Sequence, residues 1–483
     1  MVGSPSSAPK NTARKQYENL ESNGTGPLLP DDLLVDVLRR LTPRSLAVSQ
    51  CVCKDWSRVV HNHRLLRTDL LPLSLGGIFF NYQFLYYFTQ FLSRPMTGTI
   101  VFGRLNYTLP CQKLTGLDLL FVRDNCDGLL LLHHCVVNPA TRQWALLPPS
   151  PPLRQLPPDD LGYGFTYEYL VFDPTLSPNY EVLTMPNIPF NLSGCEESEW
   201  PPSTWILPVF SSPTGSWVQR SFRRDGVTAM TLTGIVGSVQ LKWRQRAYWR
   251  EALYICCSDN FIMRISLSDN TYRVIRLLTE DGEPTEHRRE LHLGKSVKGI
   301  YCATIFQGSQ LQVWFLNNQT EWVLKHDRDI SPILPNLNEY DMQRNGPWIL
   351  QKYYYWEDIT QHSDEDSAEE DSKEAIAEEN FEWDSDNDNV LEPGTRSMGS
   401  QAVFLGFHPF KEVVFLSDKF DRVLAYNWST SKLQDLGKLS PKFYLDRQDG
   451  YYHQRGVNDC YPYTPCWLSE FPEKLSLEAQ VED

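Results

Sequence analysis

A pattern of paired strands recurs along the chain beyond residue 100 and constrains its fold more than any other feature. Each copy has an apolar strand, a small polar turn and a second strand that opens on an aromatic or large apolar residue. The six copies occupy residues 129–148, 169–186, 206–222, 261–277, 311–327 and 423–437, and the opening residues are Trp144, Tyr180, Trp217, Tyr272, Trp322 and Leu433. Successive opening residues are 36, 37, 55, 50 and 111 positions apart. Repeats of this kind predict an array of similar small sheets.

The repeat spacing favours a β-propeller, whose blades recur about every 40–50 residues. Within one copy, Leu311, Val313 and Phe315 share a face, while Gln312 and Trp314 share the other, as in a strand. Six copies predict six blades, closed into a ring so that no sheet edge stays open. One β-sandwich, or two stacked sandwiches, is the alternative, but neither accounts for the repeat.

The chain has 483 residues, which is long for one domain, and its hydrophobic content of 41% suffices for a large core. Aromatic residues make up 12% of the sequence and proline occurs 33 times. This composition favours many short strands and turns over long helices.

Residues 28–68 have a helical pattern that differs from the rest of the chain. Five apolar residues lie at helical spacing on one face, namely Leu33, Leu34, Val37, Leu38 and Leu41. Pro30 suits the first helical turn, and Thr42-Pro43 ends this helix. Two further short helices follow. Some forty residues can bury only part of such an apolar surface, so we expect a partner.

The same stretch resembles the F-box. The matching residues are Leu29, Pro30, Leu33, Leu34, Val37, Leu38, Leu41, Pro43, Leu46, Val52, Cys53 and Trp56. The resemblance implies a small three-helix domain that docks on the Skp-family adaptor of a cullin–RING ubiquitin ligase. It also implies that these residues form the docking face or support the core beneath it. An amphipathic helical hairpin that covers the next domain is the alternative.

The later part of the chain resembles the F-box-associated domain of plant, particularly grass, F-box proteins. The phrases that carry the resemblance include VVNPATRQW, VFDPTLSPNYEVL, RISLSDNTYRVI and LGFHPFKEVVFL. The resemblance implies a kelch-like propeller that recruits substrates. The expected organisation is therefore multidomain, α followed by all-β: a disordered leader (1–27), a three-helix F-box (28–68), a linker with the first strands (69–98), a six-bladed β-propeller (99–440) and a C-terminal tail (441–483).

An acidic segment interrupts the propeller region at about 357–393. Residues 364–388 contain 13 Asp or Glu and one Lys, so 12 of the 15 net negative charges lie there. The segment has few apolar residues, and we expect a disordered, solvated loop. The rest of the chain shows no basic patch, which argues against nucleic acid as a partner.

The sequence shows no arrangement typical of a catalytic, cofactor or metal site. The 11 cysteines are scattered and include no CxxC pair, as expected for reduced thiols. His133 and His134 are adjacent in an apparent strand, so they would point to opposite faces. Asp124 and Asp127 fit turn chemistry better than a metal loop. Kelch-like propellers with copper oxidase chemistry exist, but their ligands must cluster in space. We therefore expect no enzyme activity and no cofactor.

Residues 70–92 carry no charge and are long enough to span a bilayer, but proline, glycine and amide residues interrupt them. We interpret them as a linker and buried strands, not as a membrane span. The first 27 residues contain no apolar stretch like that of a secretory signal. Both observations favour a cytoplasmic or nuclear protein.

Together these features predict a substrate-recognition subunit of an SCF-type ubiquitin ligase, with a Skp-family adaptor, cullin and an unknown protein target as partners. The alternative is a propeller scaffold that is not coupled to productive ubiquitylation. Target selectivity is expected in propeller loops, with Asn191–Pro202 (including Trp200) and Thr279–Glu290 as candidates.

Overall fold

The computed structural model divides the chain into two compact units, Met1–Pro72 and Leu73–Asp483, which we call the first and second units. The structure describes residues 31–41, 46, 49, 52–63, 65, 74–82, 89–95, 101, 103, 105, 121–151, 166–186, 199–226, 230–231, 245–258, 261–276, 291–296, 298–317, 321–334, 346–351, 384, 386–391, 402–418, 422–439 and 457–467.

The described part of the first unit contains two helices, α2 (Asp31–Leu38) and α4 (Lys54–Asn62). Between them, Leu46 and Ser49 are helical, and the Ser49 hydroxyl donates to the Leu46 carbonyl oxygen at 2.6 Å. The rest of 42–51 lies outside the described residues. The expected third helix is therefore not tested over its full length.

The second unit consists mainly of antiparallel four-stranded groups, which we call modules 1 to 6. Module 1 contains β3 (Asp124–Cys126), β4 (Leu129–Leu131), β5 (Cys135–Asn138) and β6 (Gln143–Leu146). Module 2 contains β7 (Thr166–Val171), β8 (Glu181–Pro186), β10 (Thr204–Ser211) and β11 (Ser216–Arg224), and module 3 contains β13 (Arg246–Trp249), β14 (Ala252–Ser258), β15 (Phe261–Ser266) and β16 (Thr271–Arg276). Module 4 contains β17 (Leu291–Ser296), β18 (Gly299–Phe306), β19 (Gln310–Asn317) and β20 (Glu321–Asp329), and module 5 contains β22 (Ala402–Phe407), β23 (Val413–Asp418), β24 (Arg422–Asn427) and β25 (Lys432–Lys438). A short ribbon joins β9 (Glu199–Trp200) to β12 (Met230–Thr231).

Module 6 is assembled from three distant parts of the chain. Its strands, in spatial order, are β26 (Val457–Tyr463), β1 (Gly77–Tyr82), β2 (Gln90–Ser93) and β21 (Ile349–Gln351). β1 and β26 pair antiparallel, with Gly77 opposite Tyr463 and Phe80 opposite Cys460. The last described strand therefore completes the sheet that the first one begins.

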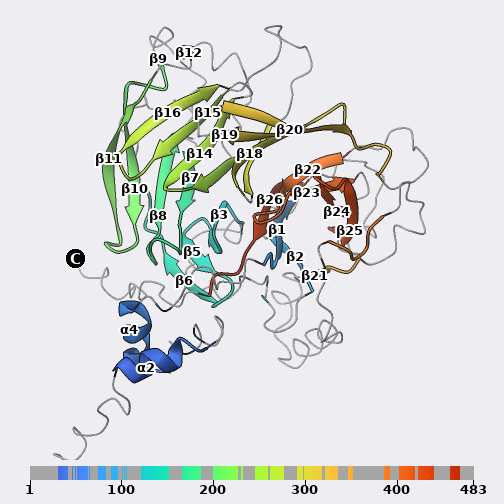
Figure 1. Ribbon diagram of the computed structural model, residues 1–483. Coiled ribbons are helices and arrows are strands. Elements are labelled where there is room, and N and C mark those ends of the chain that lie inside the picture. The colour runs from blue at the N-terminus through green and yellow to red at the C-terminus, as the bar shows by residue number, and fades with distance from the viewer. Residues whose placement is uncertain are drawn as a thin grey trace, which may run out of the picture. The chain divides into compact units, whose positions relative to one another are not determined.

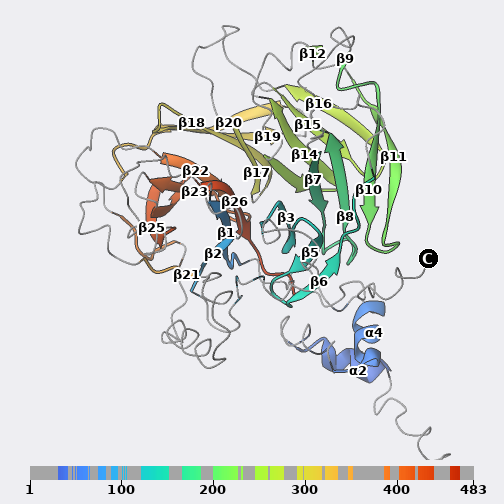
Figure 2. The same cartoon turned by 180° about the vertical axis from the view of Figure 1, so that it is seen from behind.

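The modules follow one another around a ring, which gives the unit a propeller-like arrangement (Figures 1 and 2). The first strand of each module lies towards the middle, where β26 contacts β3, β3 contacts β7, β13 contacts β17, β17 contacts β22 and β22 contacts β26. Modules 2 and 3 are also joined by a short parallel pairing of β11 with β16, which makes them one eight-stranded sheet.

Six buried apolar clusters of the second unit each combine side chains of two successive modules. Successive side chains of a strand point to opposite faces of the sheet, so one strand contributes to two clusters. On β1, Ile78 and Phe80 face module 5, whereas Phe79 faces module 1. On β18, Tyr301 and Ala303 pack with module 5. Because both faces of each module are covered, inner strands such as β18 and β23 are buried on both sides, whereas the outer strands β11 and β20 keep exposed side chains.

The six repeat copies do not correspond one to one with the six modules. Copies at 169–186 and 206–222 both lie in module 2, as β7–β8 and β10–β11, and module 6 contains no copy. The connection between β8 and β10 is long, so the two hairpins of module 2 have the sequence spacing expected of hairpins in different sheets. Module 6 was missed because its short strands come from separated segments.

The first strands were expected within residues 69–98, and β1 and β2 lie there as part of the ring. β26 also belongs to the ring, although residues 441–483 were expected to be a tail. Within the uncharged segment 70–92, which we interpreted as a linker and buried strands, the structure has β1 and β2. No described helix is long and apolar enough to cross a membrane.

The end of the predicted disordered insert is ordered against module 5. The Asp435 amide donates to the Asn389 carbonyl oxygen at 3.1 Å, and the Leu391 amide donates to that of Leu433 at 2.8 Å. The Lys411 ammonium lies 2.9 Å from the carboxylate of Asp386. Residues 386–391 therefore extend the edge of β25, contrary to the expectation of a solvated loop up to 393. Most of the insert lies outside the described residues.

Candidate functional site

The first unit exposes apolar side chains on its first described helix. Leu33 and Val37, four residues apart on α2, are 53% and 48% exposed. Val52, just before α4, is 63% exposed, and the neighbouring Cys53 is a free, exposed thiol. Several large exposed apolar groups on a small unit are typical of a surface that meets a partner. We call Leu33, Val37 and Val52 the apolar surface of the first unit.

The opposite side of α2 forms the core of the unit. Leu34, Val35 and Leu38 are buried there together with Leu46, Val59, Val60 and Leu65, and the partly buried Leu41 and Trp56 pack against them. The apolar residues of 33–41 cover more than one face of the helix. Some of them therefore face the core of the unit, and others are exposed.

The twelve residues matched to the F-box therefore occupy different environments. Leu33, Val37, Val52 and Cys53 are exposed, whereas Leu34, Leu38 and Leu46 are buried and Leu41 and Trp56 are half-buried. Leu29, Pro30 and Pro43 lie outside the described residues. The structure thus separates the candidates for partner contact from those that hold the unit together.

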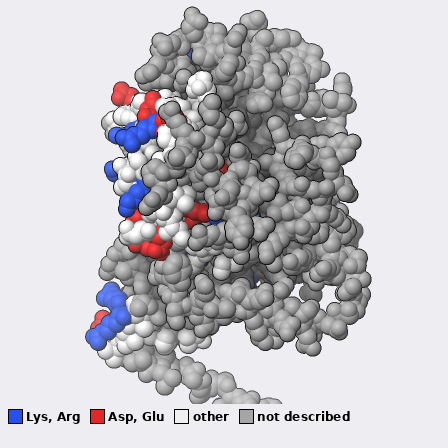
Figure 3. All heavy atoms as spheres, turned by 90° about the vertical axis from the view of Figure 1, so that its right-hand side faces the viewer, with Lys and Arg blue, Asp and Glu red and all other residues white. Residues whose placement is uncertain are grey.

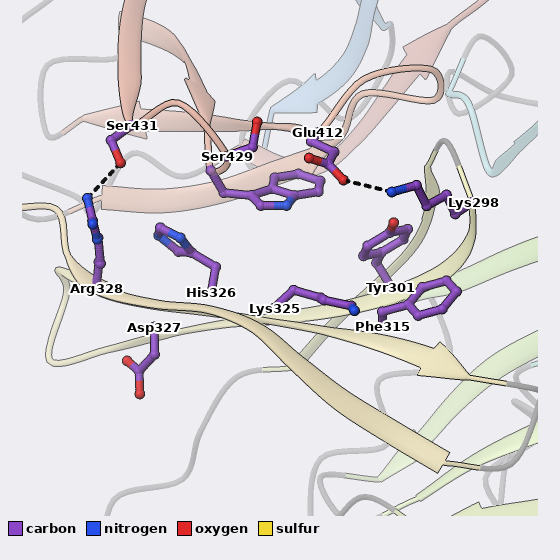
Figure 4. Close-up of a pocket in the computed structure, with 11 residues that line it drawn as sticks. Lys298, Tyr301, Phe315, Lys325, His326, Asp327, Arg328, Glu412, Ser429 and Ser431 are labelled. Carbon is purple, nitrogen blue, oxygen red and sulfur yellow. Dashed lines mark hydrogen bonds and ion pairs between the residues drawn. The ribbon is translucent and has the colours of Figure 1, made fainter.

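The second unit has a pocket of about 490 Å³ between modules 4 and 5. We call it the module 4–5 pocket; Lys298, Tyr301, Phe315, Lys325, His326 and Arg328 line it from module 4, and Glu412, Trp428 and Ser431 from module 5. Figure 4 shows these side chains converging from the two sheets. No motif in the sequence pointed to this pocket, because its residues come from different strands and turns.

Aromatic rings form the buried side of the module 4–5 pocket. Tyr301 and Trp428 are 2% and 6% exposed, and their ring centroids are 5.7 Å apart. His326 is also buried, and its Nε2 lies 3.3 Å from the Tyr426 hydroxyl. Burial, with the nearby charge of Arg328, lowers the pKa of His326, so the ring is neutral at pH 7.

The pocket's cations lie at its rim. The Arg328 guanidinium donates to the Ser431 hydroxyl at 2.7 Å, and the Lys298 ammonium lies 3.6 Å from the Glu412 carboxylate. The Lys325 ammonium lies over the Phe315 ring, 5.7 Å from its centroid. The described surface elsewhere mixes both signs: on the face drawn in Figure 3, blue and red side chains stand next to one another.

The interior of the ring contains two ion pairs that the sequence did not indicate. Arg246 on β13 pairs with Asp124 on β3, and Lys295 on β17 pairs with Asp127 in the β3–β4 turn. Asp127 and Gly128 have positive φ angles of 42° and 95°, so the predicted turn role of Asp127 is confirmed. The turn role of Asp124 is wrong, because it is a buried strand residue.

The two adjacent histidines were expected in a strand, and the structure has them elsewhere. His133 and His134 lie in a bend between β4 and β5, not in a strand, and their ring centroids are 4.1 Å apart. Burial and the charge of Arg123 lower the pKa of His134. Among the described residues, no three His, Cys, Asp or Glu side chains are grouped as metal ligands.

The two loops proposed for target selectivity are largely untested. Trp200 is 4% exposed and packs with Trp205 and Phe261 between modules 2 and 3, so it is a core residue. Residues 191–198 and 279–290 lie outside the described residues.

In comparisons with known proteins, the first unit matches the model of a known domain family. Residues 27–68 match the family model described as the F-box domain. The chain is 27% identical over 167 residues to the Arabidopsis thaliana F-box protein At1g46840, covering 32% of this chain and 33% of that protein. It is 25% identical over 177 residues to At5g52610 (33% and 46%) and 23% identical over 268 residues to At3g10430 (52% and 62%), both F-box proteins of Arabidopsis thaliana. The matches thus span less than two thirds of each of these relatives.

Among solved structures, the chain is similar to YCF48 bound to D1 peptide, with 10% identity, a TM-score of 0.30 and coverage of 77% of this chain and 84% of that one. The family match and the Arabidopsis relatives agree on the class of protein: the chain contains an F-box domain and is similar to plant F-box proteins.

Proposed function

We propose that the chain is the substrate-recognition subunit of an SCF-type cullin–RING ubiquitin ligase. The F-box match over residues 27–68 carries this proposal, because F-box domains generally bind Skp-family adaptors. In this role the first unit docks on the adaptor, and through it on cullin, while the second unit holds a target protein. The cytoplasm or the nucleus is the proposed location.

The apolar surface of the first unit supports adaptor docking. The core beneath it is complete without Leu33, Val37 or Val52, so these side chains are available to a partner. Burying one large aliphatic side chain contributes about 1.5–3 kcal/mol. We assign these three residues to the adaptor interface, and Leu34, Leu38 and Leu46 to its support.

We assign the second unit as a six-bladed, kelch-like β-propeller whose blades are modules 1 to 6. The six clusters between successive modules and the pairing of β1 with β26 support the assignment. A closed ring is a rigid scaffold that presents loops for recognition. Such a subunit needs no chemistry of its own: it raises the effective concentration of the target beside the charged conjugating enzyme.

Copurification tests the proposal. The full chain is coexpressed with a plant Skp-family adaptor and a cullin–RING pair, then captured by an affinity tag. We expect adaptor and cullin to elute together with the chain. An adaptor complex that lacks cullin would favour the scaffold alternative, and a chain that captures no adaptor would contradict the F-box role.

A further inference from the structure

We propose that the module 4–5 pocket binds an anionic side chain of a peptide, either a carboxylate or a phosphate, through the cations at its rim, Lys325 and Arg328. The proposal deepens the proposed function and rests on it, because it names the chemical class of target segment that the second unit would hold. The pocket volume of about 490 Å³ has room for a bound side chain and its neighbours.

The charge balance of the pocket favours an anion. Among the described residues, neither Lys325 nor Arg328 has an acidic partner: Arg328 donates to a serine hydroxyl, and Lys325 lies over an aromatic ring. Glu412 lies next to Lys298. Two cations at the rim are therefore left to interact with a ligand.

Asp327, the other acidic residue at the pocket, does not neutralise these cations. Its carboxylate accepts hydrogen bonds from the side-chain amides of Gln310 and Gln312, the latter at 2.9 Å. In Figure 4 the Asp327 side chain points away from the group formed by His326, Tyr301 and Lys298. Gln310 and Gln312 lie on β19, so this carboxylate, although Asp327 lines the pocket, is held along the sheet by these two amides.

A β-bulge brings Lys325 to the pocket side of module 4. The pairing of β19 with β20 shifts between Val313, opposite His326, and Trp314, opposite Leu324, so Lys325 is the extra residue. In a regular strand, adjacent side chains point to opposite faces, and Lys325 would point away from His326. The bulge instead lets the Lys325 ammonium reach Phe315, which packs towards module 5.

The surroundings strengthen an anion's interactions and provide contacts for a peptide. The buried rings of Tyr301 and Trp428 exclude water from one side, and charges attract more strongly at such a boundary than in bulk water. On β20, the outermost strand of module 4, Val323 is paired with the pocket residue Phe315 and is 36% exposed. This apolar side chain suits a residue that flanks an acidic one, which favours a peptide over a free anion.

A peptide array on the full-length chain tests the proposal without any adaptor. The probes are nine-residue peptides with randomised neutral flanks and a central glutamine, glutamate or phosphoserine. The variants are Lys325→Gln, Arg328→Gln and the double substitution. Arg273→Gln is the matched control, because Arg273 is exposed and pairs with Asp225 in another part of the second unit.

We expect peptides with central glutamate or phosphoserine to bind at least about tenfold more tightly than those with glutamine, and each pocket substitution to remove about tenfold of that preference. Arg273→Gln should keep it. The comparison of glutamate with phosphoserine shows which anion the pocket prefers. Equal binding of all three peptide sets would overturn the proposal. It would also be overturned if the double variant kept the preference for anionic peptides while its melting temperature was unchanged. Because adaptor capture is measured separately, failure here leaves the F-box role untouched.

Discussion

The guanidinium of Arg246 is paired with the carboxylate of Asp124, although these residues belong to modules 3 and 1, which are not neighbours in the ring. The side chains are 12% and 1% exposed. Asp124 also accepts the Leu170 amide of module 2 at 2.7 Å, and Arg246 lies over the Tyr461 ring of module 6, 5.7 Å from its centroid. One buried ion pair thus connects four modules inside the ring.

Removing the charge of Asp124 should destabilise the second unit. Burial lowers the pKa of Arg246 to about 10, with Tyr461 and Asp459 opposing the shift, so Arg246 stays charged at pH 7. Asp124→Asn keeps an acceptor for the Leu170 amide but leaves Arg246 without its buried counterion. We expect a loss of about 3–5 kcal/mol, measured by thermal and denaturant unfolding. Asp225→Asn is the control: its exposed pair with Arg273 should contribute less than about 1 kcal/mol. Equal effects of the two substitutions would contradict a special role for the Arg246–Asp124 pair.

Two substitutions on the exposed side of α2 should abolish adaptor binding without unfolding the chain. Leu33→Asp with Val37→Asp places two charges on the apolar surface of the first unit, and the lost burial should weaken adaptor affinity well over a hundredfold, as measured by calorimetry. The circular dichroism and melting of the double variant should match the parent.

The buried side of the same helix provides the contrast. Leu38 is fully buried, so Leu38→Ala should destabilise the first unit by about 2–5 kcal/mol and weaken binding only indirectly. Lower temperature should then restore adaptor binding to Leu38→Ala but not to the double aspartate variant. Adaptor affinity left intact by the two aspartates would contradict this assignment of the surface.

Stability should fall as the pH drops below about 6.5, in part because of His408. Its Nδ1 accepts the Phe410 amide at 3.0 Å; burial, with the charges of Lys411 and Arg94, lowers the pKa of His408 to about 3. Above the unfolded pKa of about 6.5 the residue is neutral in both states, and the native state has its full stability. Between pH 6.5 and 3 only the unfolded chain binds this proton, which removes up to about 1.4 kcal/mol per pH unit.

The variant His408→Asn isolates this contribution, because its side-chain oxygen can accept the same amide but does not titrate. The melting temperature of the variant should change less than that of the parent between pH 6.5 and 4.5. Parallel pH profiles for the two proteins would show that His408 is not responsible.

Two replacements should divide the acidic insert into a dispensable and a structural part. Exchanging residues 360–381 for a short Gly/Ser linker removes mostly charge and few apolar groups, so we expect little change in the melting temperature. Exchanging residues 384–391 removes the hydrogen bonds to Leu433 and Asp435 and the contact of Asp386 with Lys411, and should lower it by about 2 °C or more. Differential scanning calorimetry measures both. A larger effect from the first exchange would reverse this division.

Local sequence patterns determined which parts of the chain form strands and which form helices. Alternating strands with small turns, such as 311–327, form the predicted hairpin β19–β20, because strand and turn preferences act over a few residues. The spacing of Leu33, Leu34, Val37 and Leu38 likewise produces α2. Which of these leucines are core and which are exposed depended on the packing of α4 and Leu46 against one side of that helix.

Only the tertiary structure decided what depends on distant residues. The pairing of β1 with β26 brings Gly77 opposite Tyr463, and the module 4–5 pocket joins Lys325 to Trp428. Neither has a local signal, because a short strand is specified by the edge that it covers as much as by its own residues. The same holds for Arg246 and Asp124: the sequence supplied two ordinary charged residues, and closure of the ring buried them together.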